Sequence, residues 1–128
     1  MTTSSEVRGT ILLVEDSEAV RHAFGLLLRE SGYEVIEVGT GGEAILSAET
    51  SPPDVVLLDL GLPDMKGLTV VRKLKSSPRT RAVSIVALTG RALDSDRIAC
   101  EAAGCARYLT KPVDSAHLLQ TLDEFMDV

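Results

Sequence analysis

The stretch Val55-Val56-Leu57-Leu58-Asp59 places a carboxylate directly after four consecutive apolar residues. A continuous apolar run, unlike an alternating one, is typical of a strand that is buried on both faces of a parallel sheet. Comparable runs, rich in Val, Ile and Leu, occupy residues 11–14, 35–38, 83–88 and 106–109. The sequence therefore predicts five buried strands.

Segments in which apolar residues recur at helical spacing separate and follow these runs. They lie at residues 20–28, 44–48, 68–74, 93–102 and 118–125. Asp16 or Ser17 is expected to cap the first of these helices, and Asp114 the last. Because strands that alternate regularly with helices are joined by right-handed crossovers, we predict an α/β fold. Its core would be a doubly wound, five-stranded parallel sheet with helices on both faces.

Composition limits the classes of function. The 128-residue chain carries 19 acidic and 13 basic side chains, a formal net charge of -6, which disfavours binding to nucleic acid or to an anionic membrane. No apolar stretch approaches the roughly 20 residues of a membrane span, so a cytoplasmic location is expected. The length fits one domain, which we place at residues 9–128 after a flexible tail of residues 1–8.

The two cysteines, Cys100 and Cys105, are separated by four residues and have no His nearby. This spacing matches no common zinc or redox motif. Both are therefore expected to be small thiols of the hydrophobic core.

Polar residues follow four of the five predicted strands, namely Glu15 and Asp16, Asp59, Thr89, and Thr110 with Lys111. Ligands of doubly wound sheets bind beyond the carboxyl ends of the strands, so these side chains are expected to meet. Neighbouring carboxylates repel one another unless they share a cation, and oxygen ligands suit Mg²⁺. One carboxylate could then act as a nucleophile and form an acyl phosphate. The pattern predicts a phosphorylatable carboxylate beside Mg²⁺.

Four motifs in order resemble the response-regulator receiver family over roughly residues 9–126. They are Ile-Leu-Leu-Val-Glu-Asp at 11–16, Val-Val-Leu-Leu-Asp-Leu-Gly-Leu-Pro-Asp-Met-Lys-Gly at 55–67, Ala-Leu-Thr-Gly at 87–90 and Tyr-Leu-Thr-Lys-Pro at 108–112. The resemblance implies a flavodoxin-like fold with strand order 2-1-3-4-5, the second of the doubly wound orders.

The resemblance also implies a role for each matching residue. Asp59 would be the phosphoacceptor, and Glu15 and Asp16 the acidic pair of the Mg²⁺ site, completed by Asp59 and the backbone carbonyl of Gly61. Lys111 would bind the phosphoryl group, and the bond from Lys111 to Pro112 would be cis. Thr89 would be the switch hydroxyl and Tyr108 the aromatic that changes rotamer with it.

The implied partner is a histidine kinase or a histidine phosphotransfer protein, and the family allows phosphorylation-dependent dimers. No catalysis is expected beyond the chain's own phosphorylation and slow dephosphorylation.

In the first predicted helix, we expect Val20, Phe24, Leu27 and Leu28 to face the sheet. Leu26 would then be exposed on a partner-docking surface.

Two other functions stay open at this point, a Mg²⁺-dependent phosphohydrolase with an aspartyl nucleophile and a non-phosphorylated binding module of the same fold. The chain lacks the second acid two residues after Asp59 that a phosphohydrolase would use as general acid.

Nucleotide binding is disfavoured because the Gly-rich residues 39–42 lack the Lys of a P-loop, so a tight turn is expected there. Neither His22 nor His117 receives a role. The chain could be a free-standing regulator or part of a longer protein.

Overall fold

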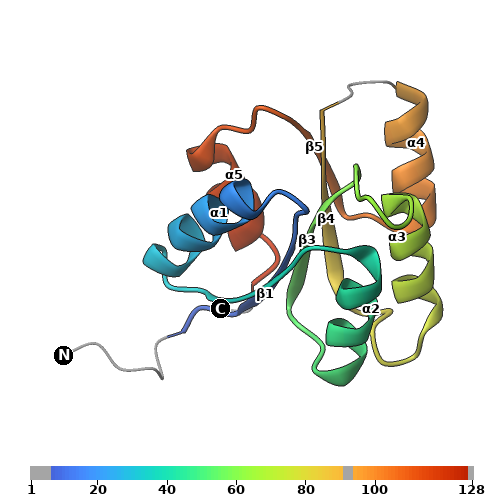
Figure 1. Cartoon of the computed structure of the whole chain (residues 1–128), viewed down its shortest axis with the longest axis horizontal. Coiled ribbons are helices and arrows are strands. Elements are labelled where there is room, and N and C mark those ends of the chain that lie inside the picture. Colours follow the sequence, from blue (N-terminus) through green and yellow to red (C-terminus); the bar gives the residue numbers. More distant parts are fainter. Residues whose placement is uncertain (1–6, 91–93, 127–128) are drawn as a thin grey trace.

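The computed structural model describes residues 7–90 and 94–126. Within them, five parallel strands form one sheet in the order β2-β1-β3-β4-β5, as predicted (Figure 1). The strands are β1 (Thr10–Val14), β2 (Glu34–Val38), β3 (Val55–Asp59), β4 (Ser84–Thr89) and β5 (Arg107–Thr110). The helices are α1 (Glu18–Glu30), α2 (Gly41–Thr50), α3 (Gly67–Ser76), α4 (Asp94–Ala103) and α5 (Ser115–Asp123).

Helices cover both faces of the sheet, with α1 and α5 on one side and α2, α3 and α4 on the other (Figure 1). Side chains along β1 and β3 alternate between the two sides, where Leu12 and Leu58 join one core cluster and Ile11 and Leu57 the other. All four are fully buried. The continuous apolar runs exist because each central strand supplies both cores.

Side-chain caps fix the starts of three helices. Ser17 accepts the N–H of Val20 at the start of α1, and Asp114 accepts that of His117 at the start of α5, which confirms both predicted caps. The expected tight turn at residues 39–42 is wrong in part. Thr40 caps α2, so Gly41 and Gly42 already belong to that helix.

The sequence predicts a flexible tail at residues 1–8. Residues 1–6 lie outside the described residues. Arg8, at the other end of that segment, pairs with Asp123 at 2.5 Å, and its guanidinium lies 4.9 Å from the centre of the Tyr33 ring. None of the helices in the described part of the chain is long and apolar enough to cross a bilayer.

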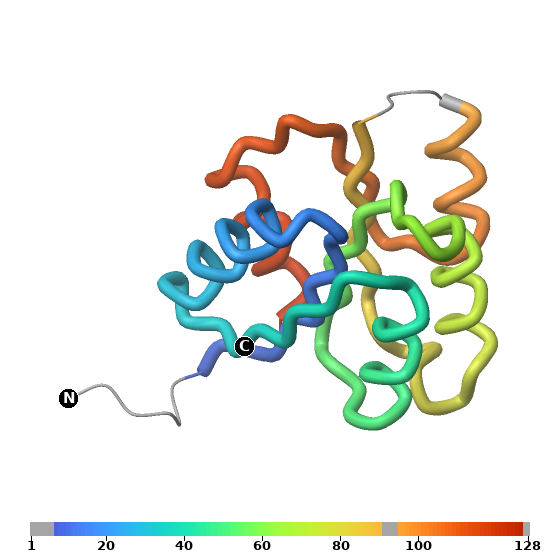
Figure 2. Tube along the Cα trace, in the orientation of Figure 1, coloured from blue at the N-terminus to red at the C-terminus, as the bar shows by residue number. Residues whose placement is uncertain are grey.

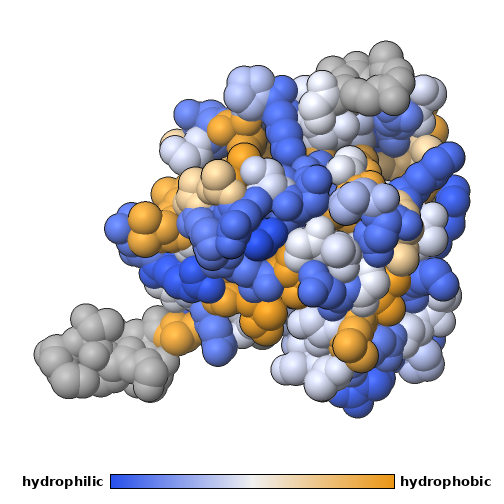
Figure 3. Space-filling view, viewed as in Figure 1, coloured by the Kyte–Doolittle hydropathy of each residue, from blue (hydrophilic) through white to orange (hydrophobic). Residues whose placement is uncertain are grey.

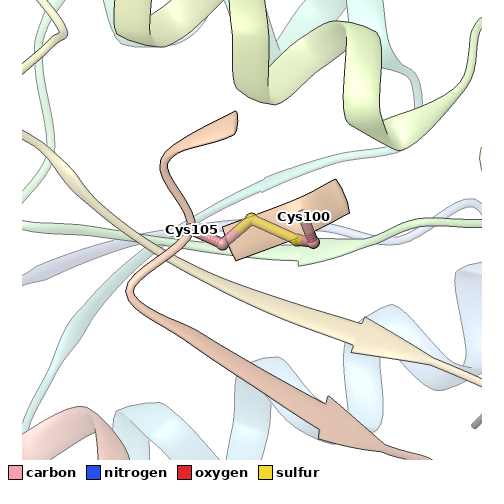
Figure 4. The surroundings of a disulfide bond; sticks show 2 residues. All are labelled: Cys100 and Cys105. Atoms are coloured by element: carbon pink, nitrogen blue, oxygen red, sulfur yellow. A yellow bond between two sulfur atoms is a disulfide. The ribbon is translucent and has the colours of Figure 1, made fainter. Parts of the chain in front are cut away.

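The two cysteines form a disulfide rather than the expected free thiols (Figure 4). Cys100 lies in α4 and Cys105 in the segment before β5, with Cα atoms 5.6 Å apart. Gly104, whose φ of +119° is in the left-handed region, reverses the chain between them. The N–H of Cys105 then donates to the Cys100 carbonyl at 3.1 Å. Spacing could not reveal the pairing, because it depends on this reversal.

Candidate functional site

The carboxyl ends of β1, β3, β4 and β5 lie at one edge of the sheet, where their connecting loops gather (Figure 2). The parallel register aligns Val14 with Leu58, Asp59 with Leu88, and Thr89 with Thr110. Residues that follow these pairs therefore emerge side by side, although they lie far apart in the sequence. The predicted polar residues meet at this edge.

Glu15, Asp16 and Asp59 form a cluster in which one carboxylate oxygen of each lies within 4.8 Å of the others. Glu15 and Asp59 are buried, 3% and 7% exposed, whereas Asp16 is open to solvent. Three oxygen ligands with one side open to water fit Mg²⁺, which prefers oxygen donors and keeps several of its waters. These residues could therefore hold the expected ion.

Lys111 reaches the same cluster from the end of β5. Its Nζ lies 2.9 Å from Asp59 Oδ2 and 3.3 Å from Glu15 Oε1. Partial burial acts to lower the pKa of Lys111, but the hydrogen bond and charge of Asp59, with that of Glu15, raise it overall. The ammonium is thus held in its charged form. The peptide bond from Lys111 to Pro112 is cis, as expected.

Glu15 is held at both its backbone and its carboxylate. Its N–H donates to the Val38 carbonyl at 3.1 Å, and its Oε2 accepts the N–H of Ser17 at 3.0 Å. Burial is the main cause that raises the pKa of Glu15, and the nearby Asp59 charge adds to it. A buried carboxylate whose ionised form is costly gains most from a cation beside it.

The loop between β3 and α3 supports Asp59. The Gly61 N–H donates to Asp59 Oδ1 at 3.0 Å, which leaves Oδ2 facing Lys111. Gly67 packs against Leu60 so closely that a Cβ at position 67 would lie 2.6 Å from the Leu60 Cα, so a larger residue would displace the loop. The role of the Gly61 carbonyl as a metal ligand stays a prediction.

Asp64 ties the same loop to α2. Its carboxylate accepts the N–H of Gly41 at 2.8 Å and that of Gly42 at 3.0 Å, at the N-terminus of the helix. These two hydrogen bonds lower the pKa of Asp64, because they stabilise the charged form. Nothing in the sequence pattern predicted this contact, although a carboxylate in a loop is a common partner of a helix N-terminus.

Thr89 is buried at the end of β4, and its carbonyl accepts the Lys111 N–H at 2.7 Å. Tyr108, on the neighbouring strand, is half-buried against the core cluster that α4 covers. A groove of about 480 Å³ runs from Asp59 and Thr89 to α4, where Asp96 and Cys100 line it. The predicted acceptor and the predicted switch hydroxyl therefore share one groove.

Leu26 is 59% exposed, as predicted, but Val20 does not face the sheet. Val20 is 38% exposed and lines an apolar depression of about 390 Å³ with Ala19, Ala23, Phe24 and Leu27. Leu26 lies beside it, three residues after Ala23 and thus on a neighbouring part of the helix surface. Hydrophobic atoms on the face in Figure 3 occur in separate patches between hydrophilic side chains.

Comparison with known proteins gives one consistent result. The family model for the response regulator receiver domain matches residues 11–123. The chain is 32% identical over 117 residues to the polar-differentiation response regulator DivK of Brucella ovis, covering 91% of this chain and 95% of that protein.

Two solved structures are similar over nearly their whole length. The chemotaxis protein CheY4 of Vibrio cholerae has a TM-score of 0.87 at 28% identity, covering 93% of this chain and 99% of that one. The receiver domain of the sensor histidine kinase PA1611 of Pseudomonas aeruginosa has a TM-score of 0.84 at 38% identity, covering 91% and 96%. That domain was crystallised with a magnesium ion coordinated in its active-site cleft.

Proposed function

Because this chain belongs to the response regulator receiver domain family, we propose that it accepts a phosphoryl group on Asp59 in a two-component phosphorelay. The donor would be a histidine kinase or a histidine phosphotransfer protein. The contact between Lys111 and Asp59 within the carboxylate cluster carries this proposal. The phosphorylated domain, which we place at residues 9–128, is the signal, and its only chemistry is gaining and slowly losing that group.

In the proposed transfer, an Asp59 oxygen bonds to phosphorus as the bond between phosphorus and the donor imidazole nitrogen breaks. The imidazole keeps the electron pair of that bond. Lys111 lies close enough to Asp59 to neutralise the phosphoryl oxygens as they arrive, and the Thr89 hydroxyl would donate to one of them. Positioning and charge neutralisation account for most of the catalysis of such transfers.

Glu15, Asp16 and Asp59, with the Gly61 carbonyl, would hold Mg²⁺. The ion supplies positive charge that offsets the negative charge of the phosphoryl oxygens. The ion in the related PA1611 receiver domain supports this assignment, as does the all-oxygen donor set of the cluster.

Phosphorylation would then draw Thr89 toward the phosphoryl group, and Tyr108 would follow. The surface formed by α4, β5 and α5 would change as a result, and it is where we place the downstream target or a phosphorylation-dependent dimer contact. The donor would dock on the apolar depression of α1 and the adjacent Leu26.

Mass measurement after incubation with acetyl phosphate and Mg²⁺ tests this function. We expect one phosphoryl group on the wild type and none on Asp59→Asn. Asp54→Asn is the matched control, because Asp54 precedes the same strand, β3, at the opposite edge of the sheet. An equal adduct on the Asp59 variant would refute the assignment. Steady turnover of small phosphate esters would instead favour a phosphohydrolase, and a wild type without any adduct would favour a binding module.

A further inference from the structure

Arg21 touches the acidic cluster from the outside. It lies in the first turns of α1, and its Nη1 donates to the backbone carbonyl of Glu15 at 2.8 Å. Its side chain is 18% exposed. A cation this close to a proposed Mg²⁺ site is unexpected on electrostatic grounds, because it would repel the ion. The contact therefore needs a different explanation.

The Arg21 guanidinium lies beside the carboxylate of Glu37, which His22 and Arg29 also contact. Glu37 lies on β2, with Oε1 at 3.7 Å from Arg21 Nε, and Arg29 fixes the other oxygen of Glu37 at 2.6 Å. Glycines leave room for these groups. A Cβ at position 39 would lie 3.1 Å from Arg21 Nη1, and one at position 25 would lie 2.4 Å from Glu37 Oε2. The packing of α1 against β2 thus directs Arg21 toward Glu15.

The Glu15 carbonyl oxygen, which accepts the hydrogen bond from Arg21, belongs to the peptide group that joins Glu15 to Asp16. A peptide group is planar, so fixing its oxygen fixes the orientation of the whole group and the position from which the Asp16 side chain leaves. The N–H of Glu15 is already held by Val38. Asp16 is solvent-exposed, and its place in the cluster depends on this backbone more than on packing.

We propose that Arg21 is a positioning residue for the cation site, which orients the peptide between Glu15 and Asp16 so that the Asp16 carboxylate meets Glu15 and Asp59. This inference rests on the proposed function, since it assigns Arg21 a role at the same site. It extends that function to a residue that is neither a metal ligand nor a contact of the phosphoryl group.

The test is a Mg²⁺ titration of the whole chain in which the NMR signals of the backbone amides report binding. Fluorescence of Trp is no alternative, since the chain has none. We expect Arg21→Ala to weaken Mg²⁺ binding by about tenfold, the lower end of the range for residues that orient metal ligands. Arg21→Lys, which keeps one donor and the charge, should recover part of the affinity. The direction is diagnostic, because loss of a positive charge alone would strengthen Mg²⁺ binding.

Arg29→Ala is the matched control, because Arg29 also lies on α1 and also pairs with Glu37. Its hydrogen bonds among the described residues go to Glu37 and the Val35 carbonyl, and not to Glu15. It should lower the melting temperature without changing Mg²⁺ affinity. Unchanged or tighter Mg²⁺ binding by Arg21→Ala overturns the proposal, as does an equal loss in Arg29→Ala. If the wild type itself binds no Mg²⁺, the metal site of the proposed function fails, and the role of Arg21 fails with it.

Discussion

Lys111 Nζ lies 2.9 Å from Asp59 Oδ2, although 51 residues separate the two in the sequence. The same nitrogen lies 3.3 Å from Glu15, so one ammonium contacts two buried carboxylates and offsets part of their negative charge. Lys111 therefore supplies positive charge to two of the carboxylates that we propose hold Mg²⁺. We therefore expect the stability of the fold and the binding of Mg²⁺ to depend on each other.

Replacing Lys111 with Met should destabilise the protein in the absence of metal, because it leaves Asp59 and Glu15 buried without their cation. We expect the free energy of unfolding in urea with a chelator to fall by about 1–3 kcal/mol, the usual cost of an unpaired buried group. Saturating Mg²⁺ should reduce this difference, since the ion replaces the lost charge. Lys73→Met, on the exposed side of α3, is the control. A loss of stability that Mg²⁺ leaves unchanged would contradict this account of the site.

Leu26→Glu should slow phosphoryl transfer from a phosphorylated histidine phosphotransfer protein, because a charge beside the apolar depression of α1 disfavours docking. Phosphorylation by acetyl phosphate, which needs no docking, should be unchanged. Reactions quenched at a series of times measure the rate of phosphorylation by each of the two donors. Leu46→Glu serves as the control, since Leu46 is 69% exposed on α2. Equal transfer rates from the protein donor in wild type and Leu26→Glu would exclude this surface.

Asp64 should give the protein a pH-dependent increment of stability. Hydrogen bonds from Gly41 and Gly42 lower its pKa in the folded state, so the unfolded chain binds the proton more readily. The stabilisation is complete above the ordinary carboxyl pKa, about 3.8, and is lost as the pH falls through the lower folded value. The urea midpoints of wild type and Asp64→Asn should therefore differ at pH 7 and begin to converge only as the pH falls below about 3.8. A difference that is constant with pH would contradict this assignment.

Reduction of the disulfide between Cys100 and Cys105 should lower the free energy of unfolding. The crosslink closes a short loop, so the expected loss is about 2 kcal/mol by the chain-entropy relation. Urea unfolding with and without a phosphine reductant measures it. Cys105→Ala should start from the lower stability and be insensitive to the reductant. If alkylation under denaturing conditions labels both thiols before any reduction, the disulfide is absent and the prediction fails.

Sequence patterns predicted much of the fold because strand burial and helix periodicity are local properties. The five apolar runs agree with the observed strands to within a residue at each end, and the caps at Ser17 and Asp114 were expected from residue type. The inner face of α1 was less predictable. Val20 has the correct spacing to face the sheet, yet it lies at the edge of the helix contact and is 38% exposed. Periodicity defines an apolar stripe but not how far a neighbouring layer covers it.

The sequence by itself determined which side chains follow the strands, and so which residues could meet at the sheet edge: Glu15, Asp16, Asp59, Thr89 and Lys111. Only the tertiary structure decided which of the other side chains and backbone groups contact one another. Arg21 bonded to the Glu15 carbonyl, Asp64 at the start of α2, and Cys100 joined to Cys105 are such contacts. Each depends on how the backbone bends and packs in three dimensions, which residue type and spacing do not specify.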